Sequence, residues 1–135
     1  MYPNTLKERL KKGEIILGTG MPAPSPHAVG TILDSEPDFL WIDTEHNPFG
    51  TEALDYIPVQ CRMRGCAPMI RVAWNDPALI KKAYDVGAVA VMVPQVDTAE
   101  EAARALGSPS TGLQRRRSAH RPRDGHDGRA RRIDL

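Results

Sequence analysis

Short apolar runs recur along most of the chain and are separated by segments in which polar and apolar residues mix. Each run is bounded by glycine, proline or charged residues, a pattern that indicates β-strands. The four predicted strands cover residues 15–21, 39–43, 67–73 and 88–94. Their apolar residues are continuous instead of alternating, which is typical of parallel strands covered on both faces.

Helix signals lie between the strands. Candidate N-cap residues stand before a proline or before a glutamate that completes a capping box, and Gly13 and Gly87 stop two of the helices. The predicted helices cover residues 5–12, 25–33, 50–64, 76–86 and 98–106. Pro58 in the third of these predicts a break or a kink, because proline cannot donate the helical hydrogen bond.

Four consecutive strand–helix units with short connections imply an α/β fold with a parallel sheet. A closed TIM barrel needs eight such units and about 250 residues. The fold class predicted here is therefore α/β, with parallel units that form the first half of a TIM barrel. A flavodoxin-like open sheet is the structural alternative, but it usually has five strands.

Charge divides the chain into two parts. Of its 135 residues, 1–106 carry 10 Lys+Arg and 14 Asp+Glu, whereas 107–135 carry 8 Arg and 3 Asp. We therefore expect a partial barrel domain at 1–106 and an Arg-rich tail at 107–135, which lacks aromatic residues, Val and Met and should be disordered. The abrupt change at Gly107 is typical of an out-of-frame reading of GC-rich coding sequence. Nucleic-acid binding by the tail is a weaker alternative, because interleaved aromatic residues and lysines are missing.

No secretory signal or membrane span is indicated, so a cytoplasmic, soluble protein with no membrane partner is expected. Cys61 and Cys66 are the only cysteines. Neither further cysteines nor a nearby histidine complete a metal site, and free thiols in a reducing compartment are expected.

Polar residues follow the predicted strands at the point where each ends. Asp43, Glu45 and His46 follow the second strand, Arg71 lies near the end of the third, and Gln95 follows the fourth. Parallel α/β proteins build their sites at this edge, although Asp43 could simply cap a helix and His46 could be a surface residue. Arg71 lies in a run expected to be buried, so it must meet an anion: either an acid from the adjacent strand end or a substrate carboxylate.

Three segments resemble the HpcH/HpaI aldolase and citrate lyase family of metal-dependent class II pyruvate aldolases. They read FLWIDTEHNPFG, APMIRVAWNDPALIKKAYDVGAVAVMVPQV and EEAARAL, and the resemblance covers about residues 5–106. It implies a TIM barrel, a divalent metal (Mg, Mn or Co) and a homo-oligomer such as a hexamer.

The resemblance also implies roles for individual residues. His46 would be the general base, Arg71 would bind the pyruvyl carboxylate and stabilise the enolate, and Asp85 would raise the basicity of the histidine. Asp85 ends a predicted helix just before a strand, so it should lie at the opposite rim and reach the site from a neighbouring subunit. Gln95 is a further candidate for substrate binding.

The family's metal is held by a glutamate and an aspartate on later strands, and no metal ligand is expected in this chain, with Glu45 at most touching a metal-bound water. The predicted function is a carbon–carbon lyase (an aldehyde-lyase) that cleaves 4-hydroxy-2-oxo acids to pyruvate and an aldehyde. This chain alone is expected to be inactive. The alternatives are a non-catalytic fragment that associates with full-length subunits, and nucleic-acid binding through the tail.

Overall fold

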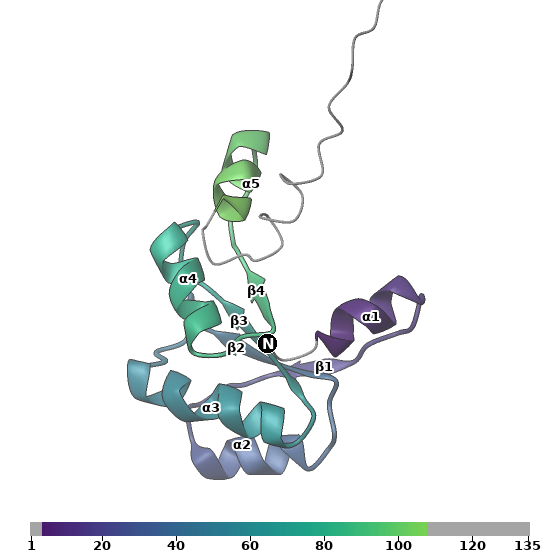
Figure 1. Ribbon diagram of the computed structural model, residues 1–135. Coiled ribbons are helices and arrows are strands. Elements are labelled where there is room, and N and C mark those ends of the chain that lie inside the picture. Colours follow the sequence, from purple (N-terminus) through teal and green to yellow (C-terminus); the bar gives the residue numbers. More distant parts are fainter. Residues whose placement is uncertain (1–3, 108–135) are drawn as a thin grey trace, which may run out of the picture.

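The computed structural model describes residues 4–107, whose arrangement is shown in Figure 1. Helices and strands alternate along this part of the chain. The helices are α1 (Thr5–Lys11), α2 (Pro26–Leu33), α3 (Thr51–Met63), α4 (Pro77–Asp85) and α5 (Ala99–Leu106). The strands are β1 (Gly18–Gly20), β2 (Phe39–Asp43), β3 (Ala67–Arg71) and β4 (Ala90–Met92). Except for Gly107, the predicted tail and its expected disorder lie outside the described residues.

The helices begin where the predicted caps stand. Asn4 and Asp76 each accept a hydrogen bond from a backbone N–H in the first turn of α1 and α4, at 3.0 and 2.7 Å. Thr98 and Glu101 form both bonds of a capping box, at 3.2 and 3.0 Å, and so satisfy two N–H groups at the start of α5. Local sequence therefore determines these helix starts, as predicted.

The strands form one parallel sheet in the order β1-β2-β3-β4. A flavodoxin-like sheet would reverse its strand order at a switch point. The four described strands show no reversal, and each βα unit adds the next strand on the same side, as in the first half of a TIM barrel. The predicted sheet is confirmed, and the carboxyl ends of its strands lie at one edge.

A hydrophobic core fills the space between the sheet and the helices α2, α3 and α4, which lie on one side of it (Figure 1). Leu40 and Ile42 of β2 are completely buried there, as are Val29 of α2 and Ile57 of α3. Each such side chain contributes about 1.5–3 kcal/mol through the apolar surface that it removes from water.

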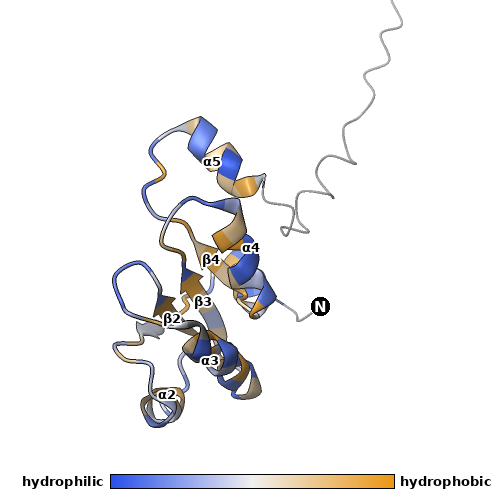
Figure 2. Ribbon diagram, turned by 90° about the vertical axis from the view of Figure 1, so that its left-hand side faces the viewer, coloured by the Kyte–Doolittle hydropathy of each residue, from blue (hydrophilic) through white to orange (hydrophobic). Residues whose placement is uncertain are grey.

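The opposite face of the sheet is only half-buried by the described residues. Phe39 and Trp41 alternate with the buried Leu40 and Ile42 along β2, although all four are apolar. Figure 2 shows β2, β3 and β4 as largely hydrophobic ribbons. The expectation that both faces are covered therefore holds for one face within residues 4–107.

Three strands are shorter than predicted. The apolar residues Ile15 and Leu17, expected in the first strand, are 81% and 72% exposed and precede β1. The backbone N–H of Leu17 donates to the side chain of Asp38 at 2.7 Å, so a carboxylate takes the place of a ladder partner. The third and fourth strands also end early, at Arg71 and Met92, although Val72 N–H still donates to the carbonyl of Met92 at 3.0 Å.

Pro58 does not break α3, which runs without interruption from Thr51 to Met63. The proline ring is fully buried, next along the chain to Ile57 in the core. We infer that burial outweighs the missing hydrogen bond, which costs about 3 kcal/mol in an exposed helix interior. The prediction of a break was wrong because tertiary packing overrides the local preference. The alternative, a kink at Pro58, stays a prediction.

Cys61 and Cys66 are both buried free thiols, as predicted. No helix within residues 4–107 is both long and apolar enough to span a bilayer.

Candidate active site

Asp43 and Arg71 form a doubly hydrogen-bonded ion pair at the carboxyl ends of β2 and β3. The two residues are direct partners in the parallel register. Arg71 Nε donates to Asp43 Oδ1 at 2.8 Å, and Arg71 Nη2 donates to Asp43 Oδ2 at 2.5 Å. Their side chains are only 18% and 12% exposed. The anion that Arg71 was expected to meet is therefore, in this chain, the acid of the adjacent strand end.

The ion pair shifts the pKa values of both partners. Hydrogen bonds from Arg71 lower the pKa of Asp43 to about 2, and backbone N–H groups act in the same direction against the effect of burial. The pKa of Arg71 is raised, chiefly by its hydrogen bonds to Asp43. Both groups therefore stay charged across the neutral pH range.

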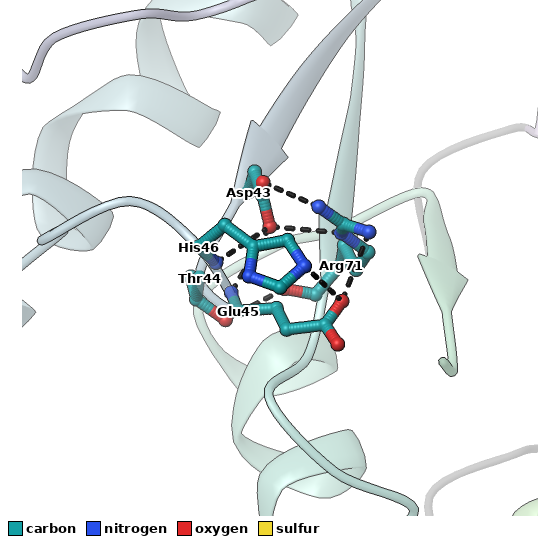
Figure 3. Close-up of polar contacts among 5 residues, drawn as sticks. All are labelled: Asp43, Thr44, Glu45, His46 and Arg71. Carbon is teal, nitrogen blue, oxygen red and sulfur yellow. Dashed lines mark hydrogen bonds and ion pairs between the residues drawn. The ribbon is translucent and has the colours of Figure 1, made fainter. Parts of the chain in front are cut away.

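The loop after β2 folds back onto this pair (Figure 3). Asp43 Oδ1 accepts hydrogen bonds from the backbone N–H groups of Glu45 at 3.0 Å and His46 at 3.4 Å. Thr44 donates to the carbonyl oxygen of Arg71 from its backbone N–H at 3.0 Å and from its hydroxyl at 2.6 Å. Short polar side chains thus fix a turn that presents Glu45 and His46 beside Arg71.

Glu45 connects the arginine to the histidine. Its Oε2 lies 2.9 Å from Arg71 Nη1 and 3.7 Å from His46 Nε2. The Glu45 side chain is 10% exposed, whereas that of His46 is 69% exposed. The imidazole is therefore open to solvent or a substrate on one side and faces a carboxylate on the other. The structure brings together Asp43, Glu45, His46 and Arg71.

Trp41 supports the guanidinium group from another direction. Arg71 Cζ lies 4.9 Å from the centroid of the Trp41 ring, a distance at which a cation is attracted to the π face. Sequence reasoning missed this residue. The sequence indicates only that Trp41, two positions before Asp43, faces the same side of the sheet, and does not reveal its contact with Arg71. Thr44 was missed too, since its contact depends on the loop's turn.

Asp85 lies away from these residues. It ends α4, which precedes β4, so it stands at the amino end of that strand, the opposite edge from Arg71. Lys81 Nζ lies 3.0 Å from its carboxylate, and both side chains are largely exposed. Within one chain, the acid beside His46 is Glu45. The role implied for Asp85 stays a prediction.

Gln95 lies just beyond β4, whose last residue, Met92, is the register partner of Arg71. Its backbone has a φ of 53°, in the left-handed region, and its side chain is exposed. The residue is thus at the same edge as Arg71, one strand further along the sheet. Its substrate contact stays a prediction.

The described residues do not provide a complete metal site. No cluster of three or more His, Cys, Asp or Glu side chains suited to a metal ion occurs within residues 4–107. The carboxylates of Asp43 and Glu45 instead face the positive charge of Arg71. These residues therefore do not fit the divalent ion that the resemblance implies.

Comparison with known proteins places these features in a family. A family model described as HpcH/HpaI aldolase/citrate lyase matches residues 19–114. The chain is 35% identical to the 2-dehydro-3,6-dideoxy-6-sulfogluconate aldolase of Pseudomonas putida, covering 83% of this chain and 45% of the relative. It is 32% identical to the hydroxypyruvate/pyruvate aldolase of Roseovarius nubinhibens, covering 82% of this chain and 44% of the relative. The chain thus spans less than half the length of these curated relatives.

A solved structure shares the same arrangement. The HpcH/HpaI aldolase/citrate lyase family protein from Burkholderia cenocepacia matches with a TM-score of 0.66 at 30% identity, covering 79% of this chain and 46% of that chain. The family match includes the paired Asp43 and Arg71 and most of the described sheet. The chain therefore belongs to the HpcH/HpaI aldolase/citrate lyase family.

Proposed function

We propose that this chain contributes to a carbon–carbon lyase that cleaves 4-hydroxy-2-oxo acids to pyruvate and an aldehyde. The observation that carries the proposal is the contact of Arg71 with Asp43 and Glu45 beside the exposed imidazole of His46. The aldolase names of its relatives support the reaction class. The activity of the whole protein is part of this proposal.

Arg71 binds the carboxylate of the 2-oxo acid in this proposal. A guanidinium group has five N–H donors, of which two donate to Asp43. Arg71 Nη1 also faces Glu45 Oε2 at 2.9 Å. In the proposal, the N–H donors that remain on the two Nη atoms bind a substrate carboxylate and the oxygen at which negative charge develops. Asp43 and Glu45 keep the planar group in place, so little reorganisation is needed when the enolate forms.

His46 is the proposed general base. It removes the proton from the C4 hydroxyl, the new C4–O double bond forms as the C3–C4 bond breaks, and the electron pair moves into the pyruvate enolate. The enolate then takes a proton at C3. An imidazole is suited to this transfer near neutral pH, and Glu45 Oε2 lies 3.7 Å from His46 Nε2.

Asp85 enters the proposal only through a second subunit, because its own chain places it at the opposite edge of the sheet. A homo-oligomer would then be required for full activity. The divalent ion expected for the family would be held by groups beyond the described residues, and Glu45 would lie at most in its outer surroundings.

A chimera tests the proposal. Residues 1–106 replace the corresponding segment of the hydroxypyruvate/pyruvate aldolase, and pyruvate release from a 4-hydroxy-2-oxo acid is measured with added Mg, Mn or Co. We expect release that is lost in Arg71→Ala. The matched control is Arg64→Ala, which alters an exposed arginine paired with Asp34 and should leave release unchanged. A folded chimera that releases no pyruvate, or that works equally well without Arg71, would contradict the proposal.

A further inference from the structure

Trp41 and Arg71 are diagonal neighbours on one face of the paired strands β2 and β3. The register sets Arg71 opposite Asp43, whereas Trp41 is the partner of Met69, so the arginine reaches back along the sheet to the indole. Its Cζ atom stops 4.9 Å from the ring centroid. The guanidinium is therefore held by Asp43 and Glu45 through its nitrogen atoms and by Trp41 through a ring contact.

The presence of tryptophan at this position needs an explanation, because its N–H group is not satisfied. Trp41 Nε1 is buried and has no hydrogen-bond partner among the described residues. A buried unpaired donor destabilises the fold, and leucine or phenylalanine would avoid that cost. Indole has the most favourable π face for a cation, and this offers a compensating gain. Gly20 is its register partner in β1, and an added Cβ there would make only an ordinary van der Waals contact with the ring, at 3.9 Å.

We propose that Trp41 is a positioning residue that holds the Arg71 guanidinium in the orientation set by Asp43 and Glu45. An arginine side chain is flexible, and a group that is fixed before its ligand arrives loses less conformational entropy on binding. The consequence for substrate binding rests on the proposed function, whereas the contact between Trp41 and Arg71 is independent of it.

The direct test is nuclear magnetic resonance of the Arg71 side chain in the full chain, with its Nε–H signal assigned through Arg71→Lys. The indole ring current should displace the signals of the guanidinium end. Trp41→Leu should abolish the displacement, Trp41→Phe should keep part of it, and Met69→Leu, a change on the same sheet face, should preserve it. An Arg71 signal that is identical with and without Trp41 would overturn the proposal.

The reverse experiment covers the case in which Trp41→Leu does not fold. In a Trp74→Phe background Trp41 is the remaining tryptophan. Arg71→Lys and Arg71→Gln should then change its emission and increase its quenching by acrylamide, whereas Arg64→Ala should not. Emission and quenching unaffected by both Arg71 variants would also overturn the proposal.

The functional consequence is measured as pyruvate affinity of the same chain. Trp41→Leu should weaken binding about threefold to tenfold, and Trp41→Phe should restore part of the loss. Equal affinity in wild type and Trp41→Leu would overturn the positioning role. Failure of the wild-type chain to bind pyruvate would count against the function proposed for Arg71, and the spectroscopic measurements would still decide whether Trp41 positions it.

Discussion

Asp43 and Arg71 occupy matching positions at the ends of two neighbouring parallel strands, and each removes the electrostatic cost of the other. The side chain of Asp43 also receives two backbone N–H groups from the following loop. The carboxylate therefore links the sheet, the arginine and the loop that carries His46. Protonation of Asp43 should weaken its hydrogen bonds to Arg71 and to the loop.

Stability should consequently fall at acid pH. The pKa of Asp43 is lowered from 3.8 to about 2 in the folded chain, so the unfolded chain binds the proton more readily. The stabilisation is fully present above the unfolded value and is lost as pH falls through the folded value. We expect the Asp43-dependent part of the urea midpoint to be constant above about pH 5 and to decline between about pH 4 and 2. In Asp43→Asn, the urea midpoint should depend less on pH between about pH 4 and 2. An equally steep fall of the midpoint in that variant would contradict the lowered pKa of Asp43.

A second prediction separates chemistry from substrate binding. In an active chimera, His46→Ala should lower aldol cleavage by about 10²–10⁴-fold, because it removes a general base. Exchange of the C3 protons of pyruvate should persist, since no hydroxyl proton must be removed. Arg71→Ala should reduce both reactions, and exchange that survives unchanged in this variant would refute its role in binding and stabilising the enolate.

Two residues of α3 that differ in burial offer a matched pair of substitutions for measuring stability. Ile57 is completely buried, whereas Val59 in the same helix is 44% exposed. Ile57→Ala should lower the free energy of unfolding by about 2–5 kcal/mol through lost contacts and a cavity. Val59→Ala should cost less than about 1 kcal/mol. Urea denaturation of both variants is the measurement, and equal losses would show that α3 packs differently.

Two glycines should respond in opposite directions to alanine. Gly87 has a φ of 107°, a backbone conformation that residues with a side chain rarely adopt, so Gly87→Ala should destabilise the chain by at least about 1 kcal/mol. Gly30 lies inside α2, where an added Cβ meets nothing within 4 Å. Gly30→Ala should stabilise by about 0.5–1 kcal/mol. Thermal unfolding of both variants provides the check, and stabilisation by Gly87→Ala would contradict the assigned backbone conformation.

Local chemistry explains why much of the fold was predictable. Ser25, Asp76 and Thr98 accept backbone hydrogen bonds within a few residues, so their sequence context is sufficient to predict helix starts. Strand order followed from the short strand–helix connections. That Asp43 and Arg71 meet could be anticipated as one of two possibilities, because both residues end apolar runs and a buried arginine requires an anion.

The sequence by itself determined the alternation of elements, the parallel sheet and the edge at which the polar residues gather, because these depend on short-range hydrogen bonding and hydrophobic pattern. Only the tertiary structure decided that α3 continues through Pro58, that Asp38 binds the backbone before β1, and that Trp41 lies against Arg71. Such outcomes depend on which side chains meet across elements, and burial or ionic contact there can outweigh a local preference of a few kcal/mol.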